Sequence, residues 1–78
     1  MKYEYDRQLL QDMMIDRGLR SADMGRLLGV SKQAFSQIWH GERGFSVPQI
    51  RKIAAAWELS PQQVVDLFIF PKNTDEAQ

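Results

Sequence analysis

Residues 21–41 have the sequence SADMGRLLGVSKQAFSQIWHG, which predicts two short helices joined by a tight turn. The first helix carries apolar residues three and four positions apart, and therefore on one face: Met24, Leu27 and Leu28. Gly29 follows, where a chain that leaves a helix often adopts a positive φ that glycine accepts without steric cost. Ser31 can then accept a hydrogen bond from a free backbone N–H at the start of the second helix.

The second of these helices has an apolar face and a polar face. Phe35 and Ile38 are expected to point inward, while the outward positions carry groups that can bond base edges: Lys32, Gln33, Ser36 and Gln37. Gly25 lies inside the first helix, where glycine costs about 1 kcal/mol relative to alanine. A close crossing of the second helix over Gly25 would explain the missing side chain. This is helix-turn-helix spacing.

Length and composition exclude several classes of protein. A chain of 78 residues forms one small domain, and without cysteine it has no disulfide or thiolate metal site. His40 cannot build a metal site by itself, and no Ser/His/Asp arrangement or glycine-rich phosphate loop indicates an enzyme. No apolar run approaches the roughly 20 residues of a membrane span, and the start MKYEYDRQ lacks the apolar segment of a signal peptide. We therefore expect a cytoplasmic, non-enzymatic domain without cofactor, metal, membrane contact or small-molecule substrate.

The net charge of zero hides an uneven distribution. Residues 1–20 are balanced, with four basic and four acidic side chains. Residues 21–52 hold five basic and two acidic side chains, a surplus of three, whereas residues 53–78 hold one basic and four acidic, a deficit of three. The basic part is the part that carries the two-helix motif. This favours a polyanionic partner, although a mixed solvated surface would also explain it.

The rest of the chain predicts three further helices. The first starts at Asp6 as N-cap and runs to Arg17, before Gly18. After a loop at residues 42–45, two stretches have the pattern of a capping box with proline in the first turn. They are Ser46-Val47-Pro48-Gln49, which opens a helix over residues 47–58, and Ser60-Pro61-Gln62-Gln63, which opens a helix over residues 61–68.

These five short helices predict an all-α bundle over residues 1–70, followed by a polar, disordered tail at residues 71–78. The spacing places Val47, Ile50, Ile53, Ala54 and Trp57 on the buried stripe of the fourth helix. Two points stay open: residues 1–5 form either a short ordered arm or a frayed end, and residues 68–70 could be extended instead of helical.

The order and spacing of these features resemble the lambda-repressor-like (Cro/CI-type, XRE-type) helix-turn-helix family over residues 9–67. The matching residues are Met24, Gly25, Leu28, Gly29, Val30, Phe35, Ile38, Gly41 and Ser46. The resemblance implies a five-helix bundle that binds operator DNA as a dimer, with the third helix in the major groove. It places base reading on Lys32, Gln33, Ser36 and Gln37, and phosphate contacts on Ser21, Ser31, Arg43 and Gly44. His40 ends the third helix, where it can interact with the helix dipole or lie near a phosphate.

Two features depart from the family pattern. Ser21 stands where the family often has a glutamine that bonds a phosphate and braces the recognition helix. Trp39 and Met14 stand where the family commonly has a Glu–Arg ion pair, and replacing a buried pair by packed apolar groups is often neutral or stabilising. We expect the Met14 sulfur to contact the Trp39 ring.

Two functions are compatible with the sequence. The first is a sequence-specific transcriptional regulator, a small repressor that binds operator DNA as a homodimer. The fifth helix and the segment after it carry more apolar surface than one small bundle can cover, so we expect the dimer interface at Val65, Phe68, Ile69 and Phe70. The second is a protein-binding module of the same fold, such as an antitoxin subunit or an antirepressor.

Overall fold

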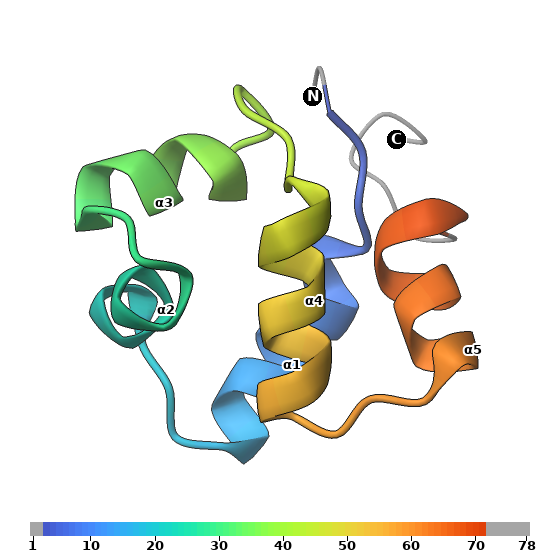
Figure 1. Ribbon diagram of the computed structural model, residues 1–78. Helices are drawn as coiled ribbons and strands as arrows, with labels where there is room; N and C mark the ends of the chain where they lie inside the picture. The colour runs from blue at the N-terminus through green and yellow to red at the C-terminus, as the bar shows by residue number, and fades with distance from the viewer. Residues whose placement is uncertain (1–2, 72–78) are drawn as a thin grey trace.

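The computed structural model describes residues 3–71, which form five helices and no strand (Figure 1). These are α1 (Arg7–Asp16), α2 (Ser21–Leu28), α3 (Lys32–Trp39), α4 (Val47–Ala56) and α5 (Pro61–Val64), and α5 continues directly into a π-helical turn, η1 (Val65–Ile69). The predicted all-α, five-helix architecture is confirmed. The tail predicted at residues 71–78 lies outside the described residues, except for Pro71.

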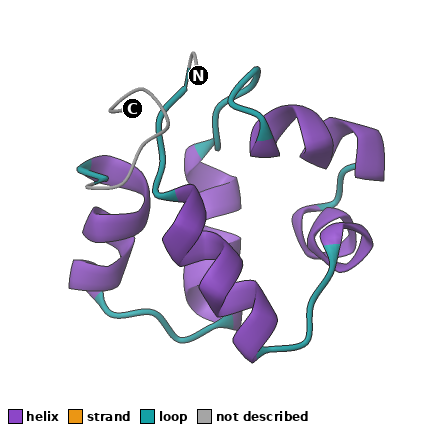
Figure 2. Cartoon of the chain, turned by 180° about the vertical axis from the view of Figure 1, so that it is seen from behind, coloured by secondary structure: helices purple, strands orange, loops and turns teal. Residues whose placement is uncertain are grey.

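The core lies where all five helical segments meet around α4. In Figure 1, α2 and α3 lie on one side of α4, and α5 with η1 lies on the other. The same arrangement is seen from behind in Figure 2, where short loops join the helices. Six side chains have no exposed surface or almost none: Leu10, Met24, Phe35, Ile38, Ile53 and Leu67. Since α1, α2, α3, α4 and η1 each supply at least one of them, these segments share one core.

Side-chain oxygen atoms cap four of the helices as the sequence predicted. Each accepts a hydrogen bond from the backbone N–H three residues later, and the caps are Asp6, Ser31, Ser46 and Ser60. At Ser46 and Ser60, the backbone N–H of the capping serine also donates a hydrogen bond to a glutamine side-chain oxygen. The acceptors are Gln49 and Gln63, and both bonds measure 2.8 Å. Both capping boxes are therefore complete, which fixes where α4 and α5 begin.

The turn between α2 and α3 is built on two glycines. Gly29 has a φ of 72°, in the left-handed region that the sequence predicted for it. The Val30 N–H donates to the Gly25 carbonyl at 2.8 Å. A Cβ on Gly25 would lie 2.8 Å from the Val30 carbonyl oxygen. The expected close approach at Gly25 is confirmed, although the backbone that comes close is the turn leading into α3, not the body of α3.

In the outer parts of the bundle, one sequence prediction was wrong and one open point is decided. Val47 was expected in the buried stripe of α4, but its side chain is 59% exposed, because it is the first residue of the helix and lies ahead of the turn that reaches the core. Residues 68–70 were considered as an extended segment. Instead the chain stays helical to Ile69, and the Phe70 N–H donates to the Val65 carbonyl at 2.8 Å.

The segment before α1 is an ordered arm from Tyr3 onward, which decides a point that the sequence left open. The Tyr3 N–H donates to the Gly41 carbonyl at 3.0 Å, and the Asp6 N–H donates to the Leu67 carbonyl at 2.9 Å. Tyr5 between them is only 3% exposed. The arm therefore joins the loop after α3 to η1.

The close approach at Gly25 and helix propensity predict opposite effects of Gly25→Ala on the free energy of unfolding. Helix propensity alone would make Gly25→Ala stabilising by about 1 kcal/mol. We expect it instead to lower the free energy of unfolding by about 1–2 kcal/mol, because the added methyl group meets a backbone carbonyl that cannot rotate away. Urea denaturation measures the difference. Ala55→Gly, at an exposed position in α4, is the control and should cost about 1 kcal/mol from propensity alone. A more stable Gly25→Ala protein would contradict the steric account.

Candidate nucleic-acid interface

The outer face of α3 presents the four residues predicted to contact bases. Lys32, Gln33 and Ser36 are exposed, and Gln37 is partly buried. The opposite face is fixed, because Phe35 and Ile38 have no exposed surface. A rigidly anchored helix with a polar outer face is the arrangement that major-groove readers use.

The residues predicted to contact phosphates fall at three places around α3. Ser21 is exposed at the first position of α2, and Ser31 caps α3, where its Oγ accepts from the Ala34 N–H at 3.0 Å. The Ser31 hydroxyl can still donate its proton. His40, the C-cap of α3, and Arg43 in the following loop are both exposed.

Gly44 has a packing role that the sequence did not reveal. A Cβ at this position would lie 2.9 Å from Cδ1 of the Tyr3 ring. The Tyr3 ring therefore covers the Gly44 backbone, and the absence of a side chain there allows the contact. The available signal was the alternation of Tyr3 and Tyr5, which places both rings on one side of an extended segment.

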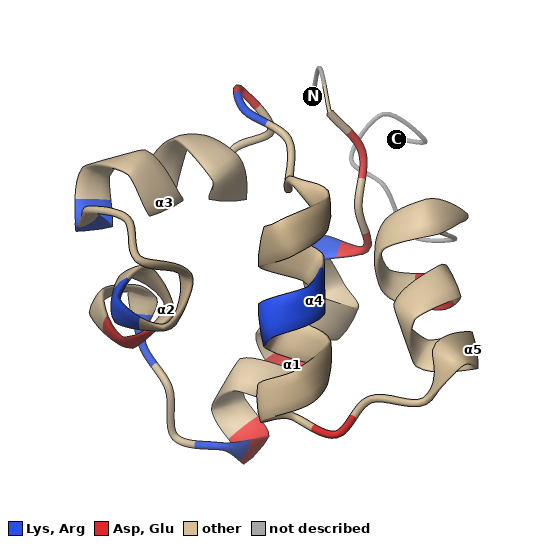
Figure 3. Cartoon of the chain, viewed as in Figure 1, with Lys and Arg blue, Asp and Glu red and all other residues tan. Residues whose placement is uncertain are grey.

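Basic side chains gather on the part of the bundle that carries the helix-turn-helix. Figure 3 shows basic positions just before α2 and on it, at the start of α3, in the loop after α3 and on α4. They are Arg20, Arg26, Lys32, Arg43, Arg51 and Lys52. The Lys52 Nζ lies 3.8 Å from the point where a Cβ on Gly29 would be, so α4 brings a cation next to the turn. Asp23 and Glu42 lower the positive charge in this part of the chain.

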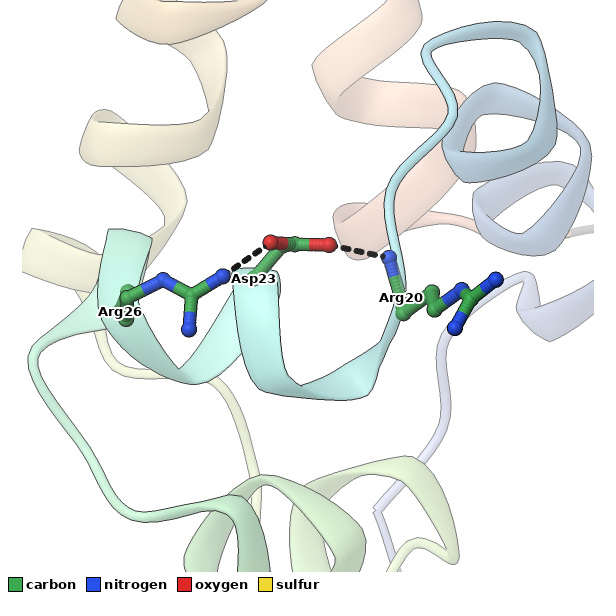
Figure 4. Close-up of polar contacts among 3 residues, drawn as sticks. All are labelled: Arg20, Asp23 and Arg26. Atoms are coloured by element: carbon green, nitrogen blue, oxygen red, sulfur yellow. Dashed lines mark hydrogen bonds and ion pairs between the residues drawn. The ribbon is translucent and has the colours of Figure 1, made fainter.

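Asp23 organises the start of α2. Figure 4 shows its carboxylate between Arg20 and Arg26, accepting from the Arg20 backbone N–H at 2.8 Å and pairing with the Arg26 guanidinium. The hydrogen bond from the Arg20 amide is the main cause that lowers the pKa of Asp23 from 3.8, and the Arg26 charge adds to it.

Comparison with known families agrees with this geometry. A family model described as a Cro/C1-type HTH DNA-binding domain matches residues 9–71. The chain belongs to the Cro/C1-type helix-turn-helix family. It is thus a DNA-binding helix-turn-helix domain at the level of the family, and the predicted resemblance is confirmed. The comparisons with curated proteins and with solved structures gave no match. Within residues 3–71, no helix is long and apolar enough to cross a membrane.

In this Cro/C1-type domain, aromatic rings surround the position of the family's ion pair. The partly buried Trp39 ring lies 6.2 Å from both the Tyr5 and the Phe35 ring, measured between centroids. The Arg7 guanidinium carbon is 5.7 Å from the Trp39 centroid, so a cation from α1 contacts this ring through its π-face. Met14 is buried, and its contact with Trp39 stays a prediction.

The predicted dimer interface needs one correction. Phe68 is only 9% exposed, and its ring packs edge-on against Phe45 with 4.9 Å between centroids, so it belongs to the core of its own domain. Regular helical spacing already places Phe68 on the same side as Val64 and Leu67, and this side faces the core. Ile69 and Phe70 are 51% and 73% exposed, and Val65 is partly buried.

The lowered pKa of Asp23 predicts a pH-dependent contribution to stability. Because the carboxyl group titrates below its ordinary value of 3.8, ionised Asp23 stabilises the fold above that pH. The contribution is lost as the pH falls through the folded-state pKa. We expect Asp23→Asn to be less stable than the original chain at neutral pH, and the difference in melting temperature to shrink well below pH 3.8. A difference that did not change with pH would show that the charge of Asp23 has no role.

Proposed function

We propose that this domain is a sequence-specific transcriptional regulator, a small repressor that binds operator DNA as a homodimer with α3 in the major groove. One observation carries the proposal: the exposed face of α3 has no acidic residue between Lys32 and His40, and its opposite face is locked into the core. Its mechanism is occupancy of DNA in the cytoplasm, without catalysis, cofactor or small-molecule substrate.

The residues at the start of α3 are suited to base reading. Lys32 can donate to O6 and N7 of guanine, and Gln33 can form a bidentate pair with N6 and N7 of adenine. Ser36 and Gln37 lie farther along α3, where they can reach a neighbouring base or a phosphate. Ser21, Ser31, His40, Arg43 and the Gly44 backbone would contact the DNA backbone around them.

The apolar side chains at the end of the chain supply the proposed dimer contact. Ile69 at the end of η1 and Phe70 directly after it each expose more than half of their surface, and Val65 at the start of η1 is partly exposed. A two-fold axis through this surface would place two α3 helices on one face of the duplex. The half-sites would then lie about 34 Å apart, one turn of DNA.

A second function is favoured by specific observations. The net charge is zero, and Ile69 and Phe70 are exposed, as expected of a protein-binding module such as an antitoxin subunit or an antirepressor. Salt dependence separates the two functions. A regulator that neutralises several phosphates loses affinity steeply as salt rises, because binding releases counterions. A protein-binding module has no measurable DNA affinity at any salt concentration.

The proposed roles of α3 and of the loop after it predict opposite phenotypes for two substitutions. Gln33→Ala should cost about 1–3 kcal/mol on the preferred duplex and relax the preference at one base pair. Arg43→Ala should weaken binding evenly across sequences and lower the salt slope by about one. Fluorescence anisotropy with a set of single-base-pair variants measures both. A changed base preference in Arg43→Ala with none in Gln33→Ala would mean that another surface docks on DNA.

The proposed dimer surface can be tested with a matched pair of exposed apolar residues. Phe70→Ser should shift the protein toward monomer, because it removes the most exposed large apolar side chain described, at 73%. Ile15→Ser is the control, since Ile15 is 66% exposed but lies on α1. Sedimentation equilibrium measures the dissociation constants. A monomeric original chain at high micromolar concentration, or equal effects of both substitutions, would exclude this interface.

A further inference from the structure

The N-terminal arm, here residues 3–6, binds the loop that carries Arg43. This α3–α4 loop comprises residues 40–46. At its start, the Tyr3 N–H donates to the Gly41 carbonyl at 3.0 Å. At its middle, the Tyr3 ring covers Gly44 so closely that a Cβ there would clash at 2.9 Å. Tyr3 therefore holds the backbone on both sides of Arg43.

Tyr5 fixes the same loop from within the core. Its hydroxyl donates to the carbonyl of Trp39, the last residue of α3, at 2.8 Å. Its ring packs edge-on against Phe45 with 5.2 Å between centroids. The last carbonyls of a helix have no partner inside the helix. The Tyr5 hydroxyl thus supplies a partner at the point where α3 ends and the loop begins.

Apart from the tyrosines, the loop backbone near Arg43 is held only by short-range hydrogen bonds to the end of α3 among the bonds described. Inside it, the Glu42 and Arg43 N–H groups donate to the Gln37 carbonyl at 2.9 Å and 3.3 Å. The Arg43 side chain is exposed. Ordering a flexible segment when it binds reduces affinity, and a segment that is already ordered avoids this cost. The two tyrosines order the loop backbone in the free protein.

We propose that Tyr3 and Tyr5 are positioning residues for the DNA backbone contact of the α3–α4 loop. They fix the loop so that Arg43 meets a phosphate without further ordering, and they touch no DNA themselves. The inference rests on the proposed function for its effect on affinity. Its structural half, an immobilised loop, can be measured in the free protein.

A double-mutant cycle between Tyr3 and Arg43 tests the effect on binding. Tyr3→Ala should lower DNA affinity about three- to tenfold, the range expected for ordering one or two side chains at an interface. The same substitution in an Arg43→Ala background should have almost no further effect, because the contact that Tyr3 positions is already gone. Tyr3→Phe keeps the ring over Gly44 and should bind like the original chain. Equal losses in both backgrounds would overturn the proposal.

Nuclear magnetic resonance of the free protein tests the loop itself. Tyr3→Ala and Tyr5→Phe should both lower the backbone order parameters of residues 42–44, while those of α1 and α4 stay unchanged and show that the fold is intact. Unchanged order in residues 42–44 would overturn the inference whatever happens with DNA. If Tyr3→Ala loosens the loop but the original chain binds no duplex at any salt concentration, the positioning of the loop stands and the proposed function fails.

Discussion

The backbone contact between Gly25 and Val30 is the constraint on which the rest of the interface depends. A hydrogen bond of 2.8 Å joins the Val30 N–H to the Gly25 carbonyl, and the Val30 carbonyl occupies the space that a side chain on Gly25 would need. Backbone atoms at this distance leave no freedom for α3 to slide along α2. This contact sets the direction in which α3 leaves the turn, and the burial of Phe35 and Ile38 then turns the polar face of α3 outward.

Both ends of α3 are then fixed by groups outside the helix. At its start, the Ser31 hydroxyl caps the Ala34 N–H. At its end, the Tyr5 hydroxyl bonds the Trp39 carbonyl and links α3 to a segment that lies before α1 in the chain. That same arm bonds Leu67 in η1 through the Asp6 N–H. Residues 3–6 therefore connect the loop after α3 with η1, the helical turn that carries part of the proposed dimer surface.

Local signals in the sequence predicted most of the fold and the polar face of α3. Ser31, Ser46 and Ser60 cap helices because their partners lie three residues away, and Gly29 marks its turn because the required φ is a property of one residue. The base-reading face of α3 was predicted from regular helical spacing around Phe35 alone. Features that depend on distant segments were not predictable in this way.

The contacts of Tyr3 with Gly44 and of Tyr5 with Trp39 join parts of the chain about 35 to 40 positions apart, so no local pattern encodes them. The burial of Phe68 depends on its contact with Phe45, which lies 23 positions earlier in the chain. Helical spacing alone does not show which distant segment covers that side of the helix, and so Phe68 was assigned to the dimer surface.

Selection from a pool of random DNA duplexes tests the central claim that the outer face of α3 reads sequence. The account predicts that rounds of binding at moderate salt enrich a short sequence in two copies, with centres about 10 base pairs apart. Retention of the pool at low salt without enrichment, or no retention at all, would contradict it. The first of these results would leave a purely electrostatic surface, and the second would leave a protein-binding module.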